Sequence, residues 1–320
     1  MILLWGLLED SPLRAIHTAL LRLLDFTDII FIDQENMLDT KIDLIVGPDL
    51  KCVLYNDKQA ADLSSVTAAY LRPYSSDYLS HPENRKNGDE NDDNNNDAQL
   101  HIAQVEDILL SWAELTPALV VNKPSKMASN NSKPYQSAMI RALGFKIPDT
   151  LITTEPIAAL EFWKKHGRVI YKSISGIRSI VSCLTPEHLQ RLENVCNCPT
   201  QFQQYIEGVE YRIHVVGDKI FACQIISPSD DYRYAVLHGQ TVDIRPCVIP
   251  ADIAERCKIL ASHMGLSVAG IDLRCTPNDE WYCFEVNPSP AFTYYQEASG
   301  QHIDEAIAEL LVKNRNIKSA

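Results

Sequence analysis

The stretch YCFEVNPSP, residues 282–290, places two oxygen-bearing side chains at the end of an apolar segment. Glu285 and Asn287 are two residues apart, and residues i and i+2 of a strand point to the same face. A carboxylate and an amide oxygen therefore point in one direction. The neighbours Phe284 and Val286 indicate a buried strand, in which a charged side chain needs a partner. The stretch therefore predicts a site in which a positively charged partner balances the charge of Glu285.

The strand before this stretch supplies a second carboxylate. Asp272 lies in VAGIDLR, and the short loop CTPNDE joins the two strands as a hairpin, which brings Asp272 beside Glu285 and Asn287. Two carboxylates and an amide oxygen, with no histidine or thiolate, suit a hard divalent cation such as Mg²⁺. Such a site leaves positions for phosphate oxygens and water, so it implies a bound nucleotide. The alternative, a surface hairpin with ordinary polar residues, leaves the charge of Glu285 unexplained.

Composition limits the partners and the location of the protein. The chain has 320 residues and a formal net charge of −13, which argues against a nucleic-acid partner because phosphate binding needs a basic surface. The odd count of nine scattered cysteines predicts reduced thiols in a cytoplasm. The first residues lack the basic start of a signal peptide, and no apolar run reaches the length of a membrane span. We expect a cytoplasmic protein with no membrane partner.

The chain divides into two parts with different patterns. Before residue 120, short apolar runs alternate with helical periodicity, which predicts an open α/β sheet. Within this part, residues 80–98 are rich in Asn and Asp and predict a mobile acidic loop. After Lys123 the pattern changes to strands joined by hairpins, including a turn at Gly217 and Asp218, which predicts α+β units.

The motifs resemble those of a known family. GIDLR followed by FEVNPSP resembles the closing signature of the ATP-grasp superfamily, in its RimK-like carboxylate–amine ligase branch, and the resemblance covers residues from about 120 to 320. The phrases NKPSKMASNNSKP and GFKIPDTLITTEP, with DYR at 231–233, are similar to ATP-grasp maturases of ribosomal peptides of the microviridin and graspetide type. The resemblance implies an N-terminal α/β domain, 1–120, followed by an α+β ATP-grasp module. Its lid subdomain, 121–200, and its C-terminal subdomain, 201–320, would clasp ATP.

The resemblance also implies site residues, position by position. Two lysines, a phosphate-loop arginine, a hinge that holds adenine and an acid that accepts ribose hydroxyls would bind the nucleotide: Lys133, Lys172, Arg178, Gln204, Tyr205, Ile206 and Glu210. Arg178 is included because its loop, SISGIRSIV, has a single glycine where relatives carry several. The metal ligands would be Asp272, Glu285 and Asn287, holding one or two Mg²⁺ ions, with Mn²⁺ as the alternative. Arg212 and Arg233 would stabilise charge on the reacting groups.

The implied activity is an ATP-dependent ligase that activates a carboxylate as an acyl phosphate and joins it to an amine or hydroxyl. The substrate would be a peptide or amino acid, with a dedicated precursor peptide as one option. Three alternatives stay open: a small-molecule dipeptide or glutamate-adding ligase, a non-catalytic nucleotide-binding regulator, and a phosphotransferase of the same fold. The resemblance leaves homo-oligomer formation open. The segment YLRPYSSDY, 70–78, leaves two readings for Arg72, a substrate carboxylate clamp or a structural strand-end residue.

Overall fold

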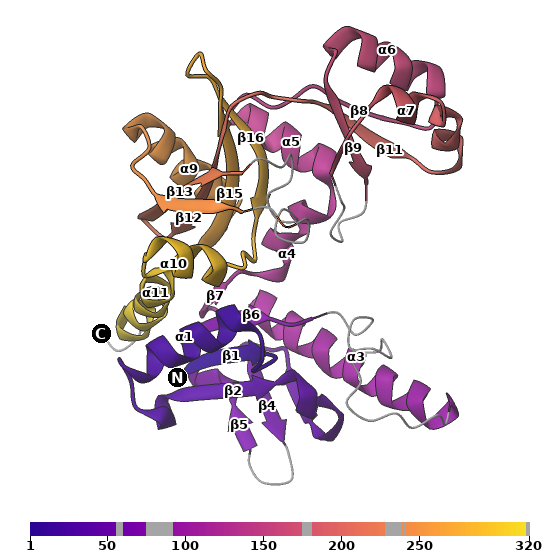
Figure 1. Ribbon diagram of the computed structural model, residues 1–320. Helices are drawn as coiled ribbons and strands as arrows, with labels where there is room; N and C mark the ends of the chain where they lie inside the picture. The colour runs from indigo at the N-terminus through magenta and orange to yellow at the C-terminus, as the bar shows by residue number, and fades with distance from the viewer. Residues whose placement is uncertain (56–59, 75–91, 175–180, 228–238, 240, 318–320) are drawn as a thin grey trace.

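The structure of the protein is a computed structural model that describes all residues except 56–59, 75–91, 175–180, 228–238, 240 and 318–320 (Figure 1). The described residues form an N-terminal domain, a small lid and a C-terminal sheet with its helices. Two predicted site residues, Arg178 and Arg233, lie outside the described residues, as does most of the predicted loop 80–98.

The N-terminal domain is built on a parallel sheet of order β2-β1-β6-β7, which confirms the predicted open α/β sheet. Its strands are β1 (Ile2–Gly6), β2 (Ile29–Asp33), β6 (Ala68–Arg72) and β7 (Leu119–Val121). Successive residues of β1 pack on opposite faces. Ile2 and Leu4 join helix α1 (Ser11–Leu21), whereas Leu3 and Trp5 join helix α3 (Asp92–Leu115). A small antiparallel sheet adds β3 (Lys41–Ile45), β4 (Lys51–Tyr55) and β5 (Ala60–Asp62).

Helix α3 begins earlier than the sequence pattern predicted. Its first residue is Asp92, so residues 92–98 of the predicted acidic loop are helical. Despite its 24 residues, α3 is not apolar enough to cross a membrane, and neither is any other helix in the described part of the chain.

The lid is an antiparallel sheet of order β10-β9-β11-β8 covered by α6 (Pro156–His166) and α7 (Pro186–Leu189). Its strands are β8 (Thr150–Thr153), β9 (Val169–Ser173), β10 (Ser182–Cys183) and β11 (Thr200–Gln204). Ala159, Val169 and Phe202 belong to its own small core. The predicted subdomain boundary at 200/201 falls inside β11, and a boundary after Gln204 fits this sheet better as a proposal.

The C-terminal sheet has the order β14-β13-β12-β15-β16, with every neighbouring pair antiparallel. Its strands are β12 (Val209–Val216), β13 (Lys219–Ile226), β14 (Asp243–Pro246), β15 (Val268–Cys275) and β16 (Trp281–Asn287). Helices α5 (Lys133–Ala142) and α9 (Ala251–His263) share a core with β12, β15 and β16. The predicted α+β character of this half is confirmed.

The final helix joins the C-terminal sheet to the N-terminal domain. Helix α11 (Ile303–Ile317) lies beside α1 in Figure 1, and a single core contains Leu13 and Ile16 of α1 with Ile303 and Ile307 of α11. The segment between β16 and α10 (Thr293–Ser299) therefore runs along the junction of the two parts. Short helices α4 (Pro124–Met127), η1 (Phe26–Asp28), η2 (Gln34–Asp39), η3 (Leu63–Ser65), η5 (Ala128–Asn131) and η6 (Leu192–Asn197) complete the described elements.

Candidate active site

A pocket lies between the lid and the C-terminal sheet. The lid side contributes Lys172 of β9, and the segment after β11 contributes Tyr205 and Ile206. The facing sheet contributes Glu210, Asp272 and Glu285 from β12, β15 and β16. With Gln204, also in the lining, the pocket brings together seven of the residues expected to bind nucleotide or metal. These residues are up to 113 positions apart in the chain, from Lys172 to Glu285.

The predicted adenine hinge crosses from one wall to the other. The amide of Gln204 donates to the Asp149 carbonyl at 2.9 Å, and the amide of Tyr205 donates to the Arg168 carbonyl at 3.0 Å. The Ile206 carbonyl accepts from Arg274 Nη1 at 2.7 Å. The hinge is therefore hydrogen-bonded to the lid at its start and to the C-terminal sheet at its end, so it connects the two walls of the pocket.

Opposite charges alternate on the face of the C-terminal sheet that borders the pocket. In the strand register, Arg212 lies opposite Asp272, and Glu210 lies opposite Arg274. Arg212 Nη1 is 2.5 Å from Asp272 Oδ1, and Arg274 forms an ion pair with Glu210. Cross-strand pairs of opposite charge stabilise a sheet, and here each cation also fixes the direction of an acidic side chain. The face is preorganised although it carries several partly buried charges.

A bulge in β16 increases the number of side chains that reach the pocket. Asp272 pairs with Glu285, but the next residue, Leu273, pairs with Cys283, so Phe284 has no partner in the register. A bulge turns two consecutive residues toward one side. Both Phe284 and Glu285 consequently line the pocket, whereas Cys283 lies in the core behind the sheet.

Of the three predicted metal ligands, Asp272 and Glu285 line the pocket, whereas Asn287 is not among its lining residues. Asp272 lies directly opposite Glu285, and Asn287 lies two pairs further along, opposite Gly270, on the same face of the strand as Glu285. Asn287 Oδ1 accepts a hydrogen bond from the Ser289 amide at 2.8 Å, which holds the amide oxygen in place. Within the described ranges no three His, Cys, Asp or Glu side chains gather as a metal site. The set therefore depends on the Asn287 amide and on oxygens from other groups, as Mg²⁺ sites commonly do.

The two carboxylates are held by cations of the protein. Asp272 pairs with Arg212, and Glu285 pairs with Lys133, the first residue of α5. Lys133 lines an open groove that adjoins the pocket rather than the pocket itself. The side chains of Asp272 and Glu285 are each 24% exposed, so they stay accessible from the pocket. An all-oxygen set of this kind fits Mg²⁺, provided that the two cations turn to other anions when the ion binds.

A buried layer supports Arg212 from behind. Its Nε donates to His214 Nε2 at a long 3.5 Å, and its guanidinium lies 5.3 Å from the centre of the Tyr295 ring. A methyl group on Gly270 would come within 2.2 Å of Arg212 Nη2, so only glycine leaves room for this side chain. Burial, followed by the charge of Arg212, holds the pKa of His214 well below its ordinary value. His214 is therefore a neutral acceptor for the arginine.

Sequence reasoning missed Arg274. The side chain is buried, lines the pocket, and lies 5.2 Å from the Phe284 ring centre and 5.3 Å from the Tyr205 ring centre. Its position two residues after Asp272, on the same face of the strand, was the available signal. That signal identifies the face but not the partner, since the register with Glu210 is not visible in a single sequence.

A profile of the RimK-like ATP-grasp domain matches residues 130–311, which is more than half of the chain. The chain belongs to the RimK-like ATP-grasp family. This family consists of carboxylate–amine ligases that use ATP, so the fold and the enzyme class expected from the motifs are confirmed. The matched region of the ligase contains every described residue of the candidate site.

Relatives of this ATP-grasp protein include a probable alpha-L-glutamate ligase of Chromohalobacter salexigens. It is 26% identical over 220 residues, which cover 64% of this chain and 71% of that protein. The macrocyclase MdnC of Microcystis aeruginosa MRC, solved with the precursor peptide MdnA, has a TM-score of 0.80 at 22% identity and covers 98% of this chain and 99% of its own. The ATP-grasp ligase PsnB, solved with a phosphomimetic variant of its minimal precursor, Mg and ADP, has a TM-score of 0.80 at 20% identity, covering 98% of both chains. These two likenesses show the fold.

Proposed function

We propose that this ATP-grasp ligase joins a carboxylate of a peptide to an amine or hydroxyl group, and that ATP binds between the lid and the C-terminal sheet. One observation carries the assignment of the site. Asp272 and Glu285 lie side by side on β15 and β16 and face a pocket whose opposite wall carries Lys172 and the hinge. This is the arrangement needed to hold a nucleotide between a cation on one side and a metal-binding pair on the other.

The ends of the nucleotide would lie at different parts of the pocket. Adenine would lie against the hinge, Gln204 to Ile206, and Glu210 would accept the ribose hydroxyls. Lys172 and Lys133 would neutralise phosphate charge. Mg²⁺, one or two ions held by Asp272, Glu285 and Asn287, would withdraw charge from the phosphate oxygens. Lys133 and Arg212, which hold the two carboxylates in this structure, would turn to phosphate and acyl oxygens.

The chemistry requires no nucleophile from the protein. A carboxylate oxygen of the substrate attacks the γ-phosphorus, the bond to the bridging oxygen of ADP breaks, and an acyl phosphate and ADP form. An amine or hydroxyl of the acceptor then attacks the acyl carbon, loses its proton and expels phosphate. Arg212 would stabilise negative charge on the acyl oxygen in both steps. Arg233 is proposed for the same region from its sequence motif alone.

The choice of a peptide substrate is supported by the similarity along the whole chain. MdnC and PsnB, both solved with precursor peptides, align with 98% of this chain, including its N-terminal domain, at a TM-score of 0.80. D-alanyl-alanine synthetase A of Vibrio cholerae covers the same share at a lower TM-score of 0.60. We therefore favour a peptide, such as a dedicated precursor, over a free amino acid. A cytoplasmic location, where ATP and precursor would meet, is part of the proposal.

A second candidate is an amino-acid ligase, which the named glutamate ligase relative supports. Incubation with Mg²⁺ and ATP, against pooled amino acids in one series and acidic peptides in another, separates the two candidates. ADP release and the mass of the product identify the substrate, since ligation removes the mass of one water. Condensation of peptides alone supports the first candidate, and condensation of amino acids alone supports the second. ATP binding without a product in either series would favour a regulator.

A further inference from the structure

A buried ion pair, Arg72 with Asp10, lies at the C-terminal ends of the central strands β6 and β1 of the N-terminal sheet. Arg72 ends β6, and Asp10 caps helix α1 by accepting from the Leu13 amide at 3.1 Å. Arg72 Nε and Nη2 donate to the two oxygens of Asp10 at 2.5 and 3.2 Å. The guanidinium thus forms a bidentate ion pair, and the carboxylate that it binds is a side chain of the protein itself.

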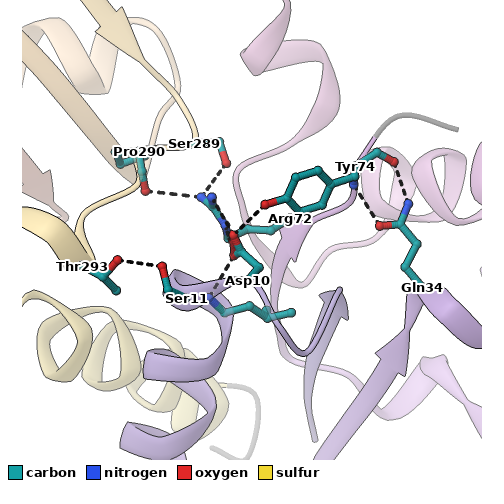
Figure 2. Close-up of polar contacts among 9 residues, drawn as sticks. Asp10, Ser11, Gln34, Arg72, Tyr74, Ser289, Pro290 and Thr293 are labelled. Carbon is teal, nitrogen blue, oxygen red and sulfur yellow. Dashed lines mark hydrogen bonds and ion pairs between the residues drawn. The ribbon is translucent and has the colours of Figure 1, made fainter. Parts of the chain in front are cut away.

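The remaining nitrogen of Arg72 reaches across to the C-terminal part of the chain. Arg72 Nη1 donates to Ser289 Oγ at 2.9 Å and to the Pro290 carbonyl at 3.3 Å, as Figure 2 shows. Beside it, the hydroxyls of Ser11 and Thr293 form a further hydrogen bond between the two parts, at 2.9 Å. Arg72 therefore connects the start of α1 with the segment that directly follows Asn287.

The segment 288–290 is held from a second direction. Asn122, which follows β7, donates to the Pro288 carbonyl at 2.6 Å and to the Val268 carbonyl at 2.7 Å. Its Oδ1 accepts from the Ser267 amide at 2.8 Å. Arg72 and Asn122 thus together hold the three residues Pro288, Ser289 and Pro290.

The held segment controls the direction of the proposed metal ligand. The Ser289 amide donates to Asn287 Oδ1 at 2.8 Å, so a shift of Ser289 moves the amide oxygen of Asn287. Groups that hold a metal ligand in place commonly change metal affinity by 10- to 100-fold when they are removed. The contact between Arg72 and Ser289 is one hydrogen bond away from the ligand.

Burial and further hydrogen bonds restrict the movement of the ion pair between Arg72 and Asp10. The side chains of Arg72 and Asp10 are only 11% and 4% exposed. Tyr74 donates from its hydroxyl to Asp10 Oδ1 at 3.2 Å, and Gln34 holds the Tyr74 backbone through hydrogen bonds of 2.6 and 2.9 Å (Figure 2). Burial acts to lower the pKa of Arg72, but Tyr70 and Asp10 raise it above its ordinary value, so the guanidinium stays charged.

We propose that Arg72 is a positioning residue of the active site: held by Asp10, it fixes Ser289 and Pro290 and thereby the direction of Asn287 toward the metal ion. This inference rests on the metal site proposed above. It also assigns the N-terminal domain a part in the chemistry of a site whose lining, among the residues that the structure describes, comes from other parts of the chain.

The test uses Arg72→Lys in the full chain. Lysine keeps the positive charge beside Asp10, but a single ammonium cannot hold Asp10 and Ser289 in the geometry of the planar fork. Arg22→Lys is the matched control, because Arg22 pairs with Glu305 across the same junction, between α1 and α11, but is exposed. Hydrogen exchange of the Ser289 amide is measured without metal, and calorimetry then measures Mn²⁺ binding to the complex with ADP. Circular dichroism confirms that each variant is folded.

The proposal predicts faster exchange at Ser289 and a 10- to 100-fold weaker Mn²⁺ affinity in Arg72→Lys, with ADP affinity in the absence of metal unchanged. Arg22→Lys should match the unaltered protein in all three measurements. Unchanged exchange and Mn²⁺ affinity in folded Arg72→Lys would overturn the inference. If Arg72→Lys does not fold, Ser289→Ala, which removes only the hydroxyl acceptor, must weaken Mn²⁺ binding in the same sense, and an unchanged affinity would overturn the inference. Failure of the unaltered protein to bind ADP or Mn²⁺ would instead refute the proposed site.

Discussion

At the scale of single residues, the site is defined by carboxylates that already have protein partners. Asp272 is held by Arg212, and Glu285 is held by Lys133. Breaking a partly buried pair by removing one member leaves the other charge without compensation. A metal ion and a triphosphate would satisfy all four charges at once, because the cations could turn to phosphate while the carboxylates bind the ion. The ion pairs therefore orient the carboxylates before the metal ion and the nucleotide bind.

Asp272→Asn should lower ATP turnover by about 100-fold or more, because it removes a charged metal ligand but keeps the size of the side chain. Steady-state ADP release at saturating Mg²⁺ measures the loss. Asp279→Asn is the control, since it makes the same charge change in the turn of the same hairpin, where Asp279 is exposed. Equal turnover in Asp272→Asn and in the unaltered protein would remove Asp272 from the metal site.

His214 predicts a pH dependence of stability. Its pKa lies well below the ordinary 6.5 in the folded protein, chiefly because it is buried and secondly because Arg212 is near. Below pH 6.5 His214 becomes protonated in the unfolded chain but stays neutral in the folded chain. This contribution to stability is therefore complete above that pH and declines as the pH falls, by about 1.4 kcal/mol per pH unit.

Urea unfolding at about pH 7 and about pH 5.5 measures this decline, on either side of the ordinary histidine pKa. His214→Gln should show a smaller loss of unfolding free energy between the two pH values than the unaltered protein. The exposed His263 provides the control, and His263→Gln should keep the full loss. Equal losses in His214→Gln and in the unaltered protein would show that His214 does not titrate in this range.

Residue by residue, the sequence predicted those parts of the site that local geometry determines. Glu285 and Asn287 share a face through the period of a strand, and a short loop returns the chain to Asp272. Contacts across long separations were not predictable in this way. Arg72 and Ser289 are 217 positions apart, and nothing near either residue indicates the other. The sequence could not show whether Arg72 binds a substrate carboxylate or a carboxylate of the protein. In the structure it binds the carboxylate of Asp10.

At the scale of secondary structure, the pocket is formed where two sheets face each other across the hinge. Most strands were predicted from their apolar patterns, including the short β7, whereas β5, β8, β10 and β14 were missed. Each of the four missed strands has four residues or fewer, too few to show a clear period. The bulge at Phe284 was also missed, since bulges leave no clear pattern in one sequence. It turns Phe284 toward the pocket and thereby gives the proposed nucleotide site an aromatic wall.

Strand β9 supplies the prediction at this scale. Lys172→Ala should weaken ATP binding about tenfold or more, because a charge-assisted contact to phosphate is lost from the lid wall. Fluorescence titration with a labelled ATP analogue measures the affinity. Lys164→Ala, on the exposed side of α6 in the same lid, should bind as the unaltered protein does. Equal affinities in the two variants would place Lys172 outside the nucleotide site.

At the scale of the whole molecule, the N-terminal domain and the C-terminal sheet share a core, whereas the lid has its own. Helix α11 packs on α1 and β1, so residues 303–311 complete the core of the first domain. Among the described residues, the buried members of the lid core lie between 159 and 202, and the partly buried Leu151 packs against them. This division predicts that the lid moves against a body formed by the rest, with the segment after β11 as the connection. Such a core could not be predicted from the sequence, because it joins segments separated by almost the entire chain.

Ile307→Ala should destabilise the protein by about 2–5 kcal/mol, since it leaves a cavity at a fully buried position of this shared core. Hydrogen exchange should increase in β1, which lies about 300 residues earlier in the chain. Ile157→Ala in α6 of the lid is the control, because Ile157 is 72% exposed and its loss should cost about 0.5 kcal/mol or less. Unchanged exchange in β1 would contradict a core shared by α11 and the first domain.

The central claim is that the enzyme activates a substrate carboxylate by transfer of the γ-phosphate. A peptide that carries heavy oxygen in its carboxylates, identified by the ligation screen, tests this claim directly. During ligation one labelled oxygen should appear in the released phosphate, because the acyl phosphate breaks between the acyl carbon and that oxygen. Released phosphate without label, or phosphate that stays on the peptide, would contradict acyl-phosphate chemistry in this protein.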